Sequence, residues 1–460
     1  MKKLLLGSTA LVAGGLMAAP AMAADPIKIG VGGYYQFYIQ AGNIESTYAA
    51  DGSSIQYKGI QFTQEGEIHF IGQSKLDNGT TVGLTVELEG WNNSVTAPGA
   101  GGQARQIDEA FLFAFGDWGR IEFGSRDQGT YRMYYGAPSA LLGFGFAQHN
   151  TNFNWASAAM INNPAQGAAT YFTIGGQYQD VNRFTYFTPR FMGLQIGVGY
   201  APKVNVAPNA VLGRGLAGGP GTGSGGVCGL TDATSSSNCP TNDNSYQDMF
   251  DVGANYLNKF GDVTVALYGA FSYMSFVPSF NNNPAANASL LTGANLAPWK
   301  QWVIGAQFGF AGFTVGGSFG YDNNGLGGNY YTGQASESRK WAAAIMYETG
   351  PWQMSFGWGH VNTDNGNGAT QLNTVAQGTT SAVAGFAVPA STAAYFGTNR
   401  AAGAAVWGGY VADKFELGVN YALGPGIKLV GGGILWNVQG PVNGTQGQSW
   451  AAMLGMDLRF

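Results

Sequence analysis

Acidic and basic side chains recur at every second position along several short segments between Glu65 and Arg183. Side chains spaced two residues apart lie on one face of a β-strand. Acidic and basic groups facing each other across a water-filled passage create a transverse field that selects solutes by charge and dipole. We expect such a face to carry Glu65, Glu67, His69, Glu87, Glu89, Asp108, Arg120, Glu122, Arg126 and Arg183.

Two further charged residues, Asp127 and Arg132, begin a long polar stretch at 127–181. We expect them to meet the charged face and to narrow the passage there. The alternative is that these charges pair with one another and only fill a wall. Because acids outnumber bases in the set, the first interpretation predicts a weak preference for cations.

No motif for catalysis or for cofactor binding accompanies these charges. Gly221–Gly226 has the spacing G-x-G-x-x-G, but no strand pattern precedes it and no helix pattern follows, so we interpret it as a flexible loop. His69, His149 and His360 lack metal-ligand spacing, and no G-x-S-x-G motif is present. The sequence therefore predicts no enzyme, no catalytic residue, no cofactor and no metal site.

Composition separates the chain from soluble domains and from helical membrane proteins. Only 10% of its 460 residues are Asp, Glu, Lys or Arg, whereas soluble domains carry about 25%. Aromatic residues make up 13% and Gly accounts for 74 residues, while mean hydropathy is −0.04. These values indicate a chain that alternates apolar with small polar residues.

The first 23 residues have the pattern of a secretory signal peptide. Lys2 and Lys3 precede an apolar stretch at 4–16, and Ala21-Met22-Ala23 forms an A-x-A cleavage site. The apolar stretch is short for a transmembrane helix, which needs about 20 residues. We expect cleavage after Ala23, which leaves one domain at 24–460 with 19 basic and 26 acidic residues. Its net charge of −7 argues against a nucleic-acid partner.

Cys228 and Cys239 are the only cysteines. They lie in a stretch rich in Gly, Ser, Asn and Thr, and a metal site would require more ligands than these two. In an exported chain such a pair favours a short-range disulfide. We expect this disulfide to close one loop and to carry no chemistry.

Apolar residues alternate with small or polar residues in many segments, as in a β-strand with one apolar face. One example is Val82, Leu84, Val86 and Leu88, and Phe111, Phe113 and Phe115 keep the same period. We expect the apolar side chains to face lipid and their neighbours to face a lumen. Further examples are the segments 263–273, 341–347 and 450–460.

Short turns alternate with long polar stretches along the chain. The seven short turns lie at 77–79, 116–119, 191–193, 259–262, 311–312, 349–351 and 424–426. The eight long stretches lie near 41–58, 92–104, 127–181, 203–246, 277–299, 323–338, 362–412 and 438–447. This layout predicts an all-β fold, a transmembrane antiparallel β-barrel of 16 strands with short periplasmic turns and long extracellular loops. Closure also removes the unpaired strand edges that lipid does not tolerate.

Several segments, in this order, resemble the Gram-negative general porin family over nearly the whole mature length. The segments that carry the resemblance are Ile29-Gly30-Val31-Gly32-Gly33-Tyr34-Tyr35, Glu67-Ile68-His69-Phe70 with Leu76-Asp77-Asn78-Gly79, Asp108-Glu109-Ala110-Phe111 with Gly119-Arg120-Ile121-Glu122-Phe123-Gly124, Tyr186-Phe187-Thr188-Pro189 with Gly193-Leu194-Gln195, and the terminal Phe460.

The resemblance implies a barrel in the outer membrane of a Gram-negative bacterium, commonly a homotrimer, that passes small hydrophilic solutes. It also implies contact with outer-membrane lipid and lipopolysaccharide, and recognition of Phe460 by the outer-membrane assembly machinery. The third loop would fold into the lumen. At 131–139 this chain lacks the Pro-Glu-Phe-Gly-Gly stretch of the best-known members, so which acid narrows the passage stays open.

We therefore expect an outer-membrane channel for passive diffusion of small hydrophilic solutes and ions. The alternative is a substrate-selective channel with an aromatic track for sugars. That track would consist of Tyr131, Tyr134, Tyr135, Phe144 and Trp155.

Overall fold

A computed structural model describes residues 26–47, 54–90, 107–146, 181–203, 245–277, 295–296, 298–323, 326–328, 337–363, 410–439 and 446–460. The strands of its first half are β1 (Lys28–Thr47), β2 (Ser54–Lys75), β3 (Thr81–Glu89), β4 (Ile107–Gly116), β5 (Gly119–Arg126), β6 (Val181–Phe187), β7 (Leu194–Lys203), β8 (Ser245–Phe260) and β9 (Val263–Val277). Those of its second half are β10 (Asn295–Leu296), β11 (Trp299–Phe310), β12 (Phe313–Asp322), β13 (Leu326–Gly328), β14 (Ser338–Thr349), β15 (Trp352–Thr363), β16 (Tyr410–Gly424), β17 (Ile427–Gln439) and β18 (Gln446–Arg459). In the described part of the chain the one α-helix, α2 (Gly129–Arg132), has four residues, and no helix there is long and apolar enough to cross a membrane.

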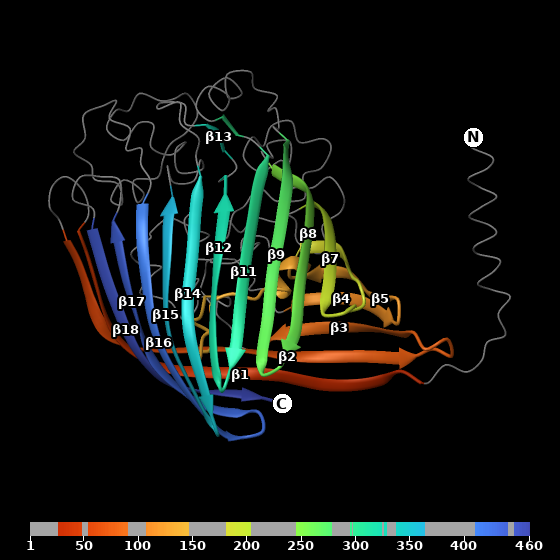
Figure 1. The fold of residues 1–460 in the computed structure, drawn as a ribbon, viewed down its shortest axis with the longest axis horizontal. Coiled ribbons are helices and arrows are strands. Elements are labelled where there is room, and N and C mark those ends of the chain that lie inside the picture. The colour runs from red at the N-terminus through yellow and green to blue at the C-terminus, as the bar shows by residue number, and fades with distance from the viewer. Residues whose placement is uncertain are drawn as a thin grey trace, which may run out of the picture.

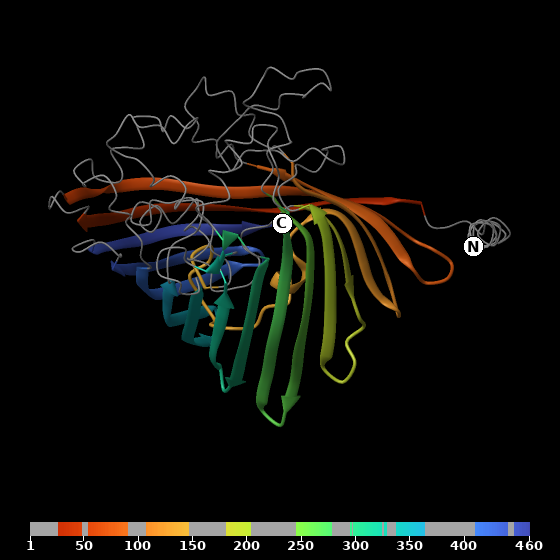
Figure 2. The ribbon, with the colours of Figure 1, turned by 90° about the horizontal axis from the view of Figure 1, so that it is seen from above.

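Sixteen of the described strands form one closed antiparallel barrel, as the sequence predicts. Each of these strands pairs with its neighbours in chain order, and β10 pairs with β13 in a separate two-stranded sheet. Figure 1 shows the strands side by side, and Figure 2, seen from above, shows them following one another around the barrel. Such an order leaves no long crossover between neighbouring strands.

The barrel closes where the first strand meets the last. β1 pairs with β18 from Tyr34 opposite Arg459 to Ser46 opposite Gly447. Next to this ladder, Gly33 N donates to Phe460 O at 3.0 Å and Phe460 N donates to Gly33 O at 3.1 Å. The last residue therefore takes part in the hydrogen bonding that removes the free edge.

All seven predicted short turns connect neighbouring strands of the barrel. In the turn between β11 and β12, Ala311 and Gly312 have φ of 50° and 84°. In the turn between β6 and β7, Met192 and Gly193 have φ of 47° and 92°. Two successive residues with positive φ match the twist of a β-hairpin, and they explain why small or flexible residues mark these turns.

One predicted loop is wrong. The stretch 41–58 is largely strand, because β1 and β2 pair without interruption from Lys28 opposite Gln73 to Thr47 opposite Ser54. Backbone pairing does not depend on apolar side chains, so strands can continue where the apolar alternation stops. The other long stretches begin and end within a few residues of the observed strand ends.

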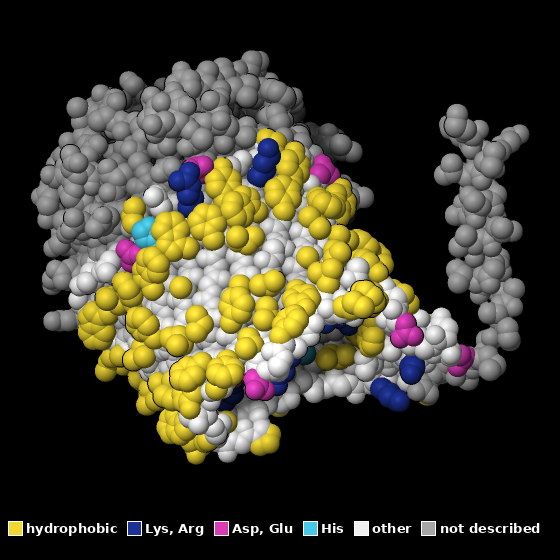
Figure 3. Space-filling view, in the orientation of Figure 1, with side chains coloured by type: hydrophobic (Ala, Val, Ile, Leu, Met, Phe, Trp, Pro, Cys, Tyr) yellow, Lys and Arg dark blue, Asp and Glu magenta, His cyan; other side chains and the backbone are white. Residues whose placement is uncertain are grey.

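The two faces of the barrel differ in polarity. Ile304 of β11 and Phe356 of β15 are among the apolar side chains exposed on the outer face. Figure 3 shows this face, where hydrophobic side chains spread over the strands and charged ones lie mainly toward the strand ends. The inner face carries buried polar residues such as Gln36, Thr63 and Asn420. The alternation therefore separates a lipid-facing surface from a polar lumen.

At β4 the predicted orientation of the aromatic side chains is wrong. Phe111 and Phe113 are 5% and 6% exposed, whereas Leu112 between them is 59% exposed. The guanidinium of Arg126 lies 3.8 Å from the centroid of the Phe111 ring. Phe111 and Phe113 therefore line the lumenal side, and Leu112 faces outward.

A β-bulge accounts for this reversal. The register between β3 and β4 shifts between Val86 and Leu88, so that Asp108 and Glu109 both lie opposite Glu87. An extra residue in one strand inverts the alternation beyond it. Periodicity alone does not reveal where such a residue is inserted.

Candidate functional site

Residues 127–146, here called the inner loop, leave the wall after β5 and lie inside the barrel. α2 forms its first turn, and backbone groups of this part accept hydrogen bonds from the wall at β8 and β9. Tyr268 of β9 donates to Thr130 O at 2.8 Å, and Asn255 of β8 donates to Met133 O at 3.1 Å. These contacts hold the start of the inner loop against the lumenal face of β8 and β9.

The second half of the inner loop continues along the lumenal wall from β11 and β12 to β15. Ser318 of β12 accepts a hydrogen bond from Tyr134 Oη at 2.7 Å, and Gln307 of β11 donates to Gly136 O at 2.9 Å. The backbone N–H of Ala140 donates to Ser355 Oγ of β15 at 2.8 Å. Polar side chains of the wall thus satisfy the backbone of a segment that makes few hydrogen bonds of its own.

Glycines of the wall leave room for the inner loop. A Cβ on Gly418 of β16 would lie 2.5 Å from Leu141 N, and a Cβ on Gly253 of β8 would lie 2.9 Å from Thr130 Cγ2. Gly305 and Gly316 are similarly close to the carbonyl oxygens of Tyr135 and Gly136. Part of the high glycine content therefore serves close approach between the loop and the wall.

Apolar packing joins the far half of the inner loop to the wall formed by β14–β18 and β1. Leu141 and Phe144 are buried in one cluster with wall side chains. Tyr38 Oη of β1 also donates to Leu142 O at 2.9 Å. The wall members of this cluster are Tyr38, Ala342, Ala344, Val361, Ala412, Val430, Ile434, Trp436, Ala451 and Met453. The inner loop therefore covers this side of the lumen.

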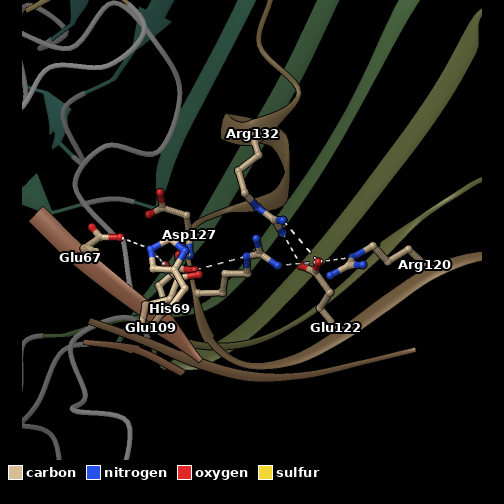
Figure 4. Close-up of polar contacts among 9 residues, drawn as sticks. Glu67, His69, Glu109, Arg120, Glu122, Asp127 and Arg132 are labelled. Carbon is tan, nitrogen blue, oxygen red and sulfur yellow. Dashed lines mark hydrogen bonds and ion pairs between the residues drawn. The ribbon is translucent and has the colours of Figure 1, made fainter. Parts of the chain in front are cut away.

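Three arginines surround Glu122 where the inner loop leaves the wall (Figure 4). Arg120 and Arg126 of β5 lie 2.5 Å and 2.8 Å from Glu122 Oε1, and Arg132 of α2 lies 2.5 Å from Glu122 Oε2. The Glu122 side chain is 3% exposed, whereas the three arginines are 19–34% exposed. The arginines therefore carry net positive charge into the lumen beside the loop.

Glu109 and Asp127 extend this cluster toward β4. The backbone N–H of Asp127 donates to Glu109 Oε1 at 2.7 Å, and Arg126 Nε lies 3.4 Å from Glu109 Oε2. Burial raises the pKa of the Asp127 carboxyl to about 7; Glu109 acts in the same direction, and Arg183 and Arg132 oppose it. Asp127 therefore changes charge near neutral pH.

Acidic side chains and one histidine occupy the neighbouring wall on β2 and β3. His69 Nε2 lies 2.8 Å from Glu67 Oε2 and 3.8 Å from Glu87 Oε2. Tyr34 Oη donates to Glu67 Oε1 at 2.8 Å. The possible ligand atoms of Glu67, His69 and Glu87 lie within 4.8 Å of one another. Among the described residues, this group therefore has the composition to hold a metal ion. The sequence did not predict this group, because Glu87 lies on β3 whereas Glu67 and His69 lie on β2.

The structure brings most of the expected site residues together on β2–β6 and the start of the inner loop. Glu67 and Glu87 contact His69, while Arg120, Arg126 and Arg132 share Glu122, so part of the set pairs within itself. Arg183 lies on the neighbouring strand β6, opposite Gly124 of β5, and 3.8 Å from Asp251 of β8. Of the remaining expected residues, Glu65 is buried, Glu89 lies opposite Glu67, and Asp108 lies in the bulge opposite Glu87.

Four residues of the site were missed by sequence reasoning. Glu109 is hidden by the bulge, and Asp251 lies far along the chain from its partner Arg183. Lys414 and Glu416 of β16 form a buried ion pair of 3.0 Å in the lumen. Opposite charges two residues apart on a strand are a usable signal for such a pair. The expected disulfide between Cys228 and Cys239 and the aromatic residue Trp155 lie outside the described residues.

Comparisons with known proteins agree with this architecture. A family model described as Gram-negative porin matches residues 7–433. No curated protein sequence matches the chain.

Among solved structures, the outer-membrane channel DcaP of Acinetobacter baumannii is similar at 11% identity, with a TM-score of 0.51, over 95% of this chain and 98% of that one. An anion-selective porin from Comamonas acidovorans is similar at 13% identity, with a TM-score of 0.48, over 94% of this chain and 100% of that one. At such identities the likeness concerns the fold alone.

Proposed function

Because the chain belongs to the Gram-negative porin family, we propose that the charged wall of β2–β5 and the inner loop together form the constriction of its channel. The protein is an outer-membrane channel for passive diffusion. In our proposal small hydrophilic solutes and ions follow their own gradients, and no catalytic step or cofactor is involved.

One contact is the main support for placing the constriction here. Arg132 of the inner loop meets Glu122 of β5, and the same cluster reaches Glu109 and Asp127. Charged side chains that are partly exposed to the lumen therefore lie where the loop leaves the wall. Solutes that pass between the loop and β2–β4 come close to both signs of charge, which favours selection by charge and dipole.

We propose weak cation selectivity for this constriction. Glu122 is compensated by three arginines, whereas the group on β2 and β3 combines Glu67 and Glu87 with one histidine. The acidic side chains named for the site outnumber the arginines, so their field favours cations over anions near β2 and β3.

The reversal potential of the purified channel in a planar bilayer under a KCl gradient tests the proposal. We expect a sign that reports preference for K⁺, and a smaller value for the variant Glu67→Gln/Glu87→Gln. The exposed turn residue Asp77 offers the control Asp77→Asn, which should leave the reversal potential unchanged. A preference for Cl⁻ in the unaltered protein would contradict the proposal.

The aromatic track for sugars receives less support than general diffusion. Phe144 is fully buried against the wall, and Tyr134 turns its hydroxyl to Ser318. The Phe144 ring is therefore not presented to a passing solute. Concentration-dependent block of the current by one sugar would favour the sugar-selective channel. Exclusion of solutes by size alone would favour general diffusion.

We also propose the features of export and assembly that the family suggests. Residues 1–23 would be removed on export, and the mature chain would form a homotrimer in contact with lipid and lipopolysaccharide. Phe460, whose side chain is exposed beside β1, would be read by the assembly machinery. N-terminal sequencing and the mass of the detergent-solubilised complex test the first two statements.

A further inference from the structure

Lys414 of β16 places a charged group beneath the far end of the inner loop. Its side chain is 1% exposed. The ammonium donates to the carbonyl oxygen of Phe144 and lies 3.4 Å from that of Gly145, and it lies 3.0 Å from Glu416 Oε2. A lysine ammonium has three N–H donors, so these three acceptors can satisfy it completely.

Two aromatic rings lie near the same ammonium. It lies 4.7 Å from the ring centroid of Phe146, which belongs to the inner loop, and 6.0 Å from that of Trp436 on β17. A cation held against ring faces and away from water interacts more strongly with its remaining partners than an exposed one. The contacts of Lys414 with the loop are therefore among the strong ones in the lumen.

We propose that Lys414 is a positioning residue that holds residues 144–146 of the inner loop against the wall and thereby sets the width of the channel. This inference rests on the proposed function, because it takes the inner loop as the constriction.

Apolar packing alone does not define one position for this end of the loop. Leu141 and Phe144 bury apolar surface against the wall, but such contacts have no preferred direction and tolerate sliding. Hydrogen bonds from an ammonium to two successive carbonyl groups are directional. Together with the hydrogen bonds from Tyr38 Oη to Leu142 O and from Ala140 N to Ser355 Oγ, Lys414 therefore fixes the position of this end of the loop.

Glu416 keeps the charge of Lys414 compensated beneath the loop. Its side chain is completely buried in the ion pair. If Lys414 is replaced by an uncharged residue, Glu416 remains as an uncompensated buried carboxylate. Such a carboxylate destabilises the folded protein unless water reaches it. Lifting the loop admits that water, so loss of Lys414 both releases the carbonyl groups and drives the loop from the wall.

Single-channel conductance and amide hydrogen exchange of 137–146, both on the full-length protein, test the proposal. We expect Lys414→Met to raise the conductance and to speed exchange in this segment about tenfold or more, since a hydrogen bond to a charged group is lost. Lys414→Arg, which keeps the charge and the donors, should restore most of both values. If the unheated sample of a variant migrates on an SDS gel as the folded form does, that variant still forms the barrel.

Two further variants separate the loop contact from simple charge effects. Lys428 of the neighbouring strand β17 donates to Gln353 Oε1 of β15 at 3.1 Å, so Lys428→Met removes an equal charge and should leave exchange in 137–146 unchanged. Lys414→Met/Glu416→Leu removes both charges, and we expect its conductance to stay raised because the carbonyl contacts are still missing.

Two results would overturn the inference: unchanged conductance and exchange in Lys414→Met, or full return of the double variant to unaltered behaviour. The second result would mean that Lys414 serves only to neutralise Glu416. If the unaltered protein failed to conduct, the proposed function would fail instead, and hydrogen exchange would still decide whether Lys414 holds the loop.

Discussion

Arg132 of α2 and Glu122 of β5 form an ion pair of 2.5 Å between Nη2 and Oε2, across the point where the chain leaves the barrel wall. The pair joins the start of the inner loop to the strand from which it departs. At the far end, Lys414 and the carbonyl oxygen of Phe144 make a second charged contact. The inner loop is therefore fastened near both ends of its described length.

Removal of the acid at the first contact should change both selectivity and stability. Glu122→Gln leaves Arg120, Arg126 and Arg132 without their shared carboxylate, so the constriction gains positive charge. We expect the reversal potential to shift toward anions and the free energy of unfolding to fall by about 1–3 kcal/mol. Bilayer recordings and urea titration measure these changes. Glu348→Gln, at the exposed end of β14, is the control and should change neither value.

The selectivity should depend on pH through Asp127. Because the pKa of its carboxyl is raised to about 7, this group is mostly neutral below that pH and negatively charged above it. We expect cation preference to increase between about pH 5.5 and about pH 8.5, on either side of that pKa. Asp127→Asn should remove much of this increase, whereas Asp77→Asn should retain it. Equal pH dependence in both variants would show that another group titrates.

A methyl group on the wall beneath the loop should displace the loop. In Gly418→Ala the added Cβ would lie 2.5 Å from Leu141 N, and such overpacking costs about 1–3 kcal/mol. We expect a higher single-channel conductance and faster hydrogen exchange in 137–146. Gly269→Ala on β9 is the matched control, since its Cβ would meet only Ile304 Cγ2 at 3.9 Å. Identical conductance of the two variants would contradict the close seating of the loop.

A charge on the outer face should oppose membrane insertion. Ile304 is 54% exposed near the middle of β11, and Ile304→Arg would place a guanidinium against hydrocarbon. We expect the folded state in a bilayer to lose about 2–4 kcal/mol of stability, measured by denaturant titration in lipid vesicles. Ile304→Leu keeps the surface apolar and should behave as the unaltered protein. A stable arginine variant would mean that this surface is not in contact with lipid.

The sequence predicted the barrel because its signals are local. Turns such as Ala311-Gly312 require particular backbone angles, and alternation along one strand reports which face is apolar. The pattern failed at β4, where one inserted residue turns Phe111 inward and brings Glu109 beside Glu87. It also failed at 41–58, where the backbones of β1 and β2 pair without interruption.

The site was harder to predict because its partners come from distant parts of the chain. The expected arginines at 120, 126 and 132 converge on Glu122 because they lie within a few residues of one another. The contact of Lys414 with Phe144 joins residues 270 positions apart. No periodicity within one strand encodes such a contact, which depends on how far the loop reaches across the lumen.

The reach of the inner loop also dictates an order of events during folding. Its hydrogen bonds to Ser355 and Asn420 span 215 and 280 residues, and contacts of such separation form late because a large loop must first be closed. The docking surface on β15–β18 is complete only when the C-terminal third has paired. We therefore expect residues 140–146 to reach their place against the wall only after the last hairpins have paired, so that this part of the lumen narrows late in maturation.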